Sequence, residues 1–166
     1  MPPMAGGTER AYIGLGANLG NPAAAIESAL AAIAGAPEIH LAARSSLYRT
    51  APLGFLDQPD FLNAVAAIDT ALQARALMQV LQGIEDKLGR ARSFRNAPRT
   101  LDLDLLLYGS AQIDLPDMQV PHPRMHARAF VLVPLAEIAP GLVIPGHGAI
   151  EPLLAGVAAQ KVDRVT

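Results

Sequence analysis

The chain has 166 residues, 51% of them hydrophobic and 17% charged, which fits one domain with a buried core and excludes a disordered protein. Its formal net charge of −2 lacks the basic excess of a general nucleic-acid binder. Cysteine is absent, which excludes disulfides and thiolate metal ligands and suits a cytoplasmic protein. No apolar run reaches the ~18 residues of a membrane span. We therefore expect a single domain over residues 1–166, monomeric, with neither nucleic acid nor membrane as partner.

Alternating and helical patterns divide the chain into elements. Residues 1–9 are expected to be a disordered lead-in. The glycines of GLGANLG (14–20) are expected to end the first strand, and Asn21 then caps a helix that Pro22 begins. Apolar residues three or four apart indicate the second helix. The predicted elements in chain order are strand 10–16, helix 22–34, strand 39–50, strand 61–69, helix 73–88 and strand 100–109.

The order strand, helix, strand, strand, helix, strand is typical of a ferredoxin-like αβ sandwich. We therefore predict an α+β fold with a mainly antiparallel sheet. The tail adds a partly helical segment over 126–138, a short strand over 142–145 and a short helix over 150–158. Loops are expected over 51–59, which holds two prolines and a glycine, and over 89–98, which is basic.

The segment TLDLDLLLYG (100–109) places two carboxylates in a leucine-rich strand. Asp102 and Asp104 would share one face, ~6–7 Å apart along the chain, while Leu101, Leu103 and Leu105 face the core. Adjacent carboxylates repel each other, and a divalent cation such as Mg²⁺ relieves that repulsion. The alternative is that both carboxylates lie on a solvated face of the sheet.

Four arginines precede this strand, at positions 90, 92, 95 and 99. Arginine is suited to bidentate recognition of phosphate, and a metal-binding carboxylate pair beside arginines is what phosphoryl transfer needs. Alternatively, Lys87, Arg90 and Arg92 complement the C-terminus of the preceding helix. The combination with the carboxylates favours the phosphate interpretation.

Two other segments carry weaker signals. GLGANLG misses the dinucleotide pattern G-x-G-x-x-G by one residue, and the chain has no P-loop motif, so a turn before the helix is the preferred role. VPHPRMHARAF (120–130) contains His122 and His126, but no third zinc ligand is spaced nearby. Phe61 and Asn63 would share a strand face, where a ring beside an amide could hold a flat heterocycle.

On these residues the chain resembles the 6-hydroxymethyl-7,8-dihydropterin pyrophosphokinase family. RNAPRTLDLDLL (95–106) fits the family signature, supported in order by YIGLGANLGNP, SSLYRTAPLGFLDQPDFLNAV and VPHPRMHARAFVLVPLAEIAP. The resemblance implies an enzyme of folate biosynthesis. It transfers the β,γ-diphosphate of ATP to the hydroxymethyl oxygen of the pterin and releases AMP.

The resemblance also implies a role for particular residues. Two Mg²⁺ ions would bind Asp102 and Asp104. The implied catalytic residues are Arg90, Arg92 and Arg99. The implied pterin-binding residues are Thr50, Leu53, Phe61, Asn63 and Phe130. The implied nucleotide-binding residues are Gln82, Glu85, His122 and Arg128. Loops 51–59 and 89–98 would close over the substrates and exclude water.

The sequence departs from some relatives at three of these segments. Phe61 replaces a tyrosine and keeps the ring, while Asn96 replaces a tryptophan and Pro123 a tyrosine. No general base is evident, so Asp102 or Asp104 is the hypothesis for that role. The open alternatives are another Mg²⁺-dependent nucleotidyl or phosphoryl transferase, and a ligand-binding domain without turnover.

Overall fold

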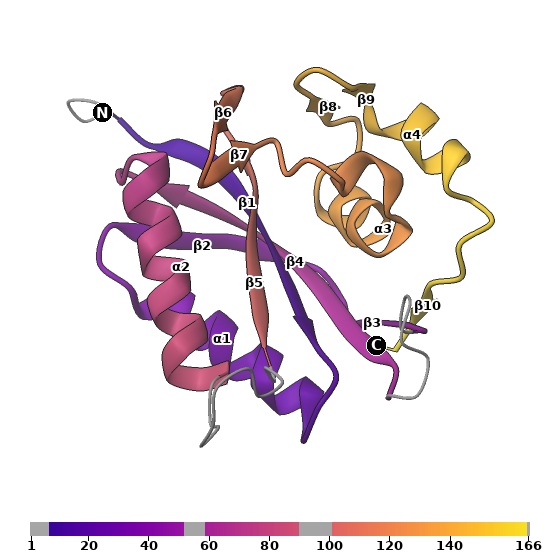
Figure 1. Ribbon diagram of the computed structural model, residues 1–166, viewed down its shortest axis with the longest axis horizontal. Coiled ribbons are helices and arrows are strands. Elements are labelled where there is room, and N and C mark those ends of the chain that lie inside the picture. The colour runs from indigo at the N-terminus through magenta and orange to yellow at the C-terminus, as the bar shows by residue number, and fades with distance from the viewer. Residues whose placement is uncertain (1–6, 52–58, 90–100, 166) are drawn as a thin grey trace.

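The computed structural model describes residues 7–51, 59–89 and 101–165. Its main sheet has the strand order β10-β3-β4-β1-β5, with β2 also paired to β4, and every pair is antiparallel. The strands of this sheet are β1 (Glu9–Ala17), β2 (Ile39–Arg44), β3 (Tyr48–Thr50), β4 (Phe61–Thr70), β5 (Asp102–Tyr108) and β10 (Asp163–Arg164). The predicted ferredoxin-like α+β sandwich is confirmed (Figure 1).

Two helices cover one face of this sheet (Figure 1). Helix α1 (Pro22–Gly35) begins after Asn21, whose side chain accepts a hydrogen bond from the Ala24 N–H as a helix cap should. Helix α2 (Ala74–Gly89) packs beside α1. Their apolar faces bury Ile26, Ile33, Leu77 and Leu81 completely or almost so. Burial of these stripes fixes the helices on the sheet.

The opposite face of the sheet packs against the C-terminal helices. Helix α3 (Ala129–Ile138) packs on β4, and α4 (Ile150–Gly156) packs on α3 (Figure 1). A 3₁₀ turn, η1 (Met125–Ala127), leads into α3. Two small hairpins complete the described chain, β6 (Ile113–Leu115) with β7 (Met118–Val120) and β8 (Val143–Ile144) with β9 (Gly148–Ala149). No helix in these described ranges is both long and apolar enough to cross a membrane.

Three details of the sequence prediction are wrong. β1 begins at Glu9, inside the predicted lead-in, because Glu9 pairs with Thr70 of β4; residues 1–6 lie outside the described residues. Gly14 and Gly16 do not end that strand, since β4 and β5 pair with them on both sides, whereas Gly20 adopts φ +65° in the following turn. The break in β1 therefore falls later than the glycine pattern indicated.

The third error concerns the single strand predicted over 39–50. The chain bends at Ser45 and divides it into β2 and β3, which both pair with β4. At the bend the Ser45 N–H donates to the Val65 carbonyl over 2.8 Å, and Ser45 Oγ accepts from the Val65 N–H over 2.9 Å. A side-chain oxygen thus replaces one carbonyl of the ladder, which keeps the buried backbone satisfied through the bend.

Candidate active site

Strand β5 carries Asp102 and Asp104 at the edge of the main sheet. Both aspartates are exposed, while the alternate residues Leu103 and Leu105 are buried against the α1 and α2 side. The predicted division of this strand into a core face and an acidic face is confirmed. The register shifts after Leu105, because Ile13 pairs with Leu105 and Tyr12 with Leu107, and this bulge lets both Leu106 and Leu107 join the core cluster that includes α3.

The neighbouring strand leaves open space beside the two carboxylates. Asp104 pairs with Gly14 and Asp102 with Gly16, so no side chain projects from β1 at either position. A Cβ atom on Gly16 would lie 3.2 Å from Asn63 Oδ1. The absence of these two side chains is what opens a cavity between β1, β4, β5 and the start of α3.

This first cavity has a volume of about 250 Å³. Its lining includes Thr50, Phe61, Asn63 and Phe130, the predicted pterin residues within the described chain, and Leu53 lies outside the described residues. The Asn63 amide Nδ2 donates to Thr50 Oγ1 over 3.0 Å, and the Asn63 side chain is only 6% exposed. A buried amide and two phenyl rings lining one cavity suit a flat ligand with hydrogen-bonding edges.

Arg128 lines this same first cavity. Its guanidinium carbon lies 5.4 Å from the centroid of the Phe130 ring, within the range of a cation–π contact. Sequence reasoning grouped Arg128 with Gln82, Glu85 and His122, but the chain turns through η1 between His122 and Arg128. The structure therefore brings Arg128 together with the predicted pterin residues.

A second cavity of about 410 Å³ lies on the other side of the β5 edge. Gln82 and Glu85 from α2 line it, together with His122 and the β6–β7 hairpin residues Asp117 and Gln119. The hairpin was not predicted, although Pro116 and Asp117 between its two short strands are a turn signal. This hairpin forms one wall of the second cavity, and the sequence interpretation did not include it.

Two polar groups of the second cavity also complete the hydrogen bonding of β5. Glu85, 8% exposed, accepts a hydrogen bond from the Leu103 N–H over 2.8 Å. The His122 N–H donates to the Leu106 carbonyl over 2.9 Å. These contacts cover the outer edge of β5 and hold it in place, as an edge strand requires.

The His122 ring is a neutral donor in this wall. Burial lowers the pKa of His122; the cations of Arg128 and Arg124 also lower it, while the Asp104 carboxylate opposes the shift. His122 Nδ1 accepts from the Arg124 N–H over 3.3 Å, so the proton of the neutral ring resides on Nε2. At neutral pH the ring can therefore donate one hydrogen bond to an acceptor in the cavity.

Asp102 and Asp104 line both cavities, and no other residue of the described chain does so. The carboxylate pair thus forms the boundary between two binding spaces. Within the described ranges, no group of three or more His, Asp or Glu side chains is placed to hold a metal ion. The predicted catalytic residues Arg90, Arg92 and Arg99 lie outside the described residues.

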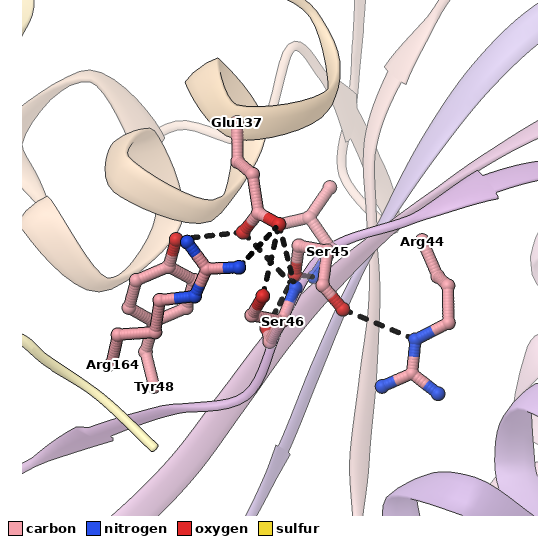
Figure 2. A network of polar contacts seen from close by, with 7 residues as sticks. Arg44, Ser45, Ser46, Tyr48, Glu137 and Arg164 are labelled. Carbon is pink, nitrogen blue, oxygen red and sulfur yellow. Dashed lines mark hydrogen bonds and ion pairs between the residues drawn. The ribbon is translucent and has the colours of Figure 1, made fainter. Parts of the chain in front are cut away.

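Glu137 near the end of α3 joins this helix to β3 and to the bend before it (Figure 2). It accepts hydrogen bonds from the Ser46 N–H and Ser46 Oγ, both over 3.0 Å, and from the Tyr48 hydroxyl over 2.6 Å. Arg164 of β10 approaches it to 3.8 Å. Thr50 lies two residues after Tyr48 in β3 and Phe130 lies in the first turn of α3, so Glu137 links the two elements that carry these cavity residues.

The ionisation of this cluster follows from the same contacts. Burial raises the pKa of Tyr48 to about 12, and the neighbouring Glu137 carboxylate contributes to the increase. For Glu137 burial acts to raise the pKa, but the hydrogen bonds from Tyr48 and Ser46 and the charge of Arg164 outweigh it and leave the pKa lowered. The charged form of Glu137 is therefore the form that the fold stabilises.

Glu137→Gln should lower the free energy of unfolding at neutral pH by about 2 kcal/mol, because it removes a charged acceptor of several hydrogen bonds. A carboxylate with a lowered pKa in the fold contributes stability above its ordinary pKa of 4.5, and that contribution disappears as pH falls through the lowered value. Urea unfolding at neutral pH and at about pH 3 tests this, since the difference from wild type should shrink in acid.

Glu27→Gln is the matched control, because Glu27 makes only a surface ion pair with Arg44. Its expected cost is below about 1 kcal/mol. Equal effects of the two substitutions at neutral pH would contradict the role assigned to Glu137.

The family model and the most similar relatives all indicate the same protein family. The family model described as 7,8-dihydro-6-hydroxymethylpterin-pyrophosphokinase (HPPK) matches residues 12–140. The 2-amino-4-hydroxy-6-hydroxymethyldihydropteridine pyrophosphokinase of Pseudomonas aeruginosa is 48% identical over 95% of this chain and 97% of its own length. The protein of the same name from Methylorubrum extorquens is 47% identical over 94% of this chain and 98% of its own length.

Solved structures agree on the fold. The wild-type Plasmodium falciparum HPPK-DHPS with pteroate superposes with a TM-score of 0.69 at 14% identity. That match covers 92% of this chain and 43% of the Plasmodium chain, so this chain spans less than half of that protein. At this identity the likeness shows the fold alone.

Proposed function

This chain belongs to the 7,8-dihydro-6-hydroxymethylpterin-pyrophosphokinase family, and we propose that it transfers diphosphate from ATP to 6-hydroxymethyl-7,8-dihydropterin. The family membership that the sequence predicted is confirmed by the family model and by relatives that match nearly end to end. In the proposed reaction the hydroxymethyl oxygen attacks the β-phosphorus of ATP and gives up its proton, for which Asp102 or Asp104 is the proposed acceptor. The bond between the β-phosphorus and the oxygen bridging to the α-phosphate breaks, and AMP leaves with that oxygen.

The observation that carries this proposal is the position of Asp102 and Asp104 in the walls of both cavities. A diphosphate transfer needs an acceptor site and a donor site that meet at the transferred group. The first cavity, with its amide and phenyl rings, suits the pterin. The second cavity, with Gln82, Glu85 and neutral His122, suits the nucleotide. The phosphates would then lie at the carboxylate pair.

The donor set fits magnesium. Two carboxylates on one face of a strand are hard oxygen ligands, and Mg²⁺ usually takes one or two of these together with water and substrate phosphates. We propose that Asp102 and Asp104 hold two Mg²⁺ ions. When bound, the ions would neutralise charge that develops on the phosphoryl oxygens.

The protein's own groups would then orient the two substrates. Asn63 and Thr50 would bind the polar edge of the pterin, and Phe61 and Phe130 would pack on its faces. His122 Nε2 would donate to a phosphate or ribose oxygen. Arg90, Arg92 and Arg99 are proposed to act on the phosphates, in keeping with the bidentate chemistry of arginine. We propose that one copy of the chain suffices for turnover, which sedimentation of the active enzyme tests.

Product analysis distinguishes this proposal from its alternatives. Purified protein with ATP, Mg²⁺ and the hydroxymethyl pterin should release AMP, and omission of the pterin should abolish the release. ADP as the product would indicate a simple kinase, and inorganic pyrophosphate would indicate a nucleotidyl transferase. Failure to consume ATP under these conditions would leave only a ligand-binding domain.

A further inference from the structure

The C-terminal tail after α4 lies outside the 12–140 region that the family model matches, yet it contacts both ends of α3. Figure 1 shows it running from α4 back to β10 beside β3. Near its start, Val157 is buried against α3 and its neighbours. Near its end, Arg164 approaches Glu137, and the Val165 N–H donates to the Leu47 carbonyl over 2.8 Å.

The contact nearest the site comes from Gln160. Its Oε1 accepts a hydrogen bond from the Ala129 N–H over 2.9 Å, and its Nε2 donates to the Ala127 carbonyl over 2.9 Å. One amide therefore binds the backbone on both sides of Arg128. The first N–H groups of a helix need partners from outside the helix, and the Arg128 side chain at the N-cap of α3 supplies none. Gln160 takes the place of that cap.

The backbone of Arg128 is held at its own atoms as well. Its N–H donates to the Met125 carbonyl over 3.2 Å, and its carbonyl accepts from the N–H groups of Val131 and Leu132 over 3.1 and 3.0 Å. Gln160 completes this set by fixing the two neighbouring peptide groups. The Arg128 side chain, which these backbone hydrogen bonds orient, lies over Phe130 and lines the first cavity.

We propose that Gln160 is a positioning residue for diphosphate transfer, which acts by fixing Arg128 and Phe130 at the first cavity. The proposal rests on the proposed function, because it assumes that this cavity holds the pterin. Gln160 is itself exposed, so its amide contributes little by burial. Its effect should therefore appear in the use of the pterin more than in stability.

Gln160→Met keeps the length of the side chain and removes both hydrogen bonds. It should lower kcat/KM for the pterin by about tenfold, since small displacements of substrate-positioning groups are costly, and leave the KM for ATP within about twofold. Lys161→Met is the matched control, because within the described residues Lys161 makes an exposed ion pair with Asp163 over 3.8 Å. Steady-state kinetics with AMP as the readout measures both variants.

A double-mutant cycle with Arg128→Ala separates positioning from general stabilisation. If Gln160 acts through Arg128, adding Gln160→Met to Arg128→Ala should lower kcat/KM by no more than about a further twofold. Independent, multiplicative losses would overturn the proposal, as would wild-type kcat/KM in Gln160→Met alone. Failure of the wild-type protein to release AMP would instead refute the proposed function, and it would be seen before any variant is compared.

Circular dichroism and thermal unfolding establish that each variant is folded. If Gln160→Met does not fold, Gln160→Glu provides the second test, because it keeps the acceptor for Ala129 and loses the donor to Ala127. It should show the same coupling to Arg128→Ala. Loss of the fold in both variants would assign Gln160 a purely structural role and overturn the proposal.

Discussion

Asp104→Ala is expected to lower kcat for diphosphate transfer by about 10³-fold or more, and Asp102→Ala by a similar factor. The carboxylate pair would hold the metal ions that neutralise the transferred phosphates, a contribution of several kcal/mol. Each 1.36 kcal/mol of lost transition-state stabilisation is a factor of ten in rate. Both side chains are exposed at the boundary of the two cavities, so their removal leaves the leucine core of β5 intact.

Single-turnover kinetics in saturating ATP, pterin and Mg²⁺ measures this loss directly. Asp69→Ala is the matched control, because Asp69 lies at the far end of β4 and pairs with Arg10 at the surface. It should retain the rate of the wild type. The pterin should still bind to Asp104→Ala, since the amide and rings of the first cavity are unchanged. A rate within tenfold of wild type in both aspartate variants would exclude the carboxylate pair from the chemistry.

Asn63→Ala is expected to raise the KM for the pterin by about 100-fold, with a smaller change in kcat. Removing one hydrogen-bonding group from such a site weakens ligand binding strongly, because the buried polar groups that it bound are left without a partner. The Asn63 amide is buried, and its Nδ2 already donates to Thr50 Oγ1 over 3.0 Å, so its orientation is fixed before the ligand arrives. Alanine removes this fixed group.

Gly16→Ala provides a graded version of the same test. The added Cβ would lie 3.2 Å from Asn63 Oδ1 and displace the amide without deleting it. The Cβ added by Gly14→Ala would come nearest to the Leu106 side chain, at 3.4 Å, which is ordinary contact. The KM for the pterin should therefore be highest in Asn63→Ala, lower in Gly16→Ala and lowest in Gly14→Ala. An unchanged KM in Asn63→Ala would show that the pterin does not use this cavity.

The strands and helices of the main sandwich could be predicted in chain order, because each of them follows from a local pattern in the sequence. Helices α1 and α2 follow from apolar spacing and from Asn21, and the acidic face of β5 follows from strict alternation. The bend at Ser45 could not be predicted, since the segment contains no glycine or proline. It depends on Ser45 Oγ bonding across to Val65 and on Ser46 bonding to Glu137, which is 91 residues away in the sequence.

The same distinction holds for the site. The carboxylate pair and the amide of Asn63 carry signals in their own segments, so sequence reasoning found them. Gly14 and Gly16 were interpreted as strand breakers, because their pairing with β4 and β5 is a tertiary property. The family resemblance groups Arg128 with His122, whereas the structure shows Arg128 in the lining of the first cavity. Gln160 carries no local signal, since its two partners lie about thirty residues earlier.

The most direct test of the account is a ³¹P NMR experiment that follows the phosphorus atoms of ATP during turnover with the hydroxymethyl pterin and Mg²⁺. We expect AMP and a pterin diphosphate to appear in equal amounts as ATP is lost, with the β- and γ-phosphorus transferred together. Appearance of ADP with a pterin monophosphate would contradict it.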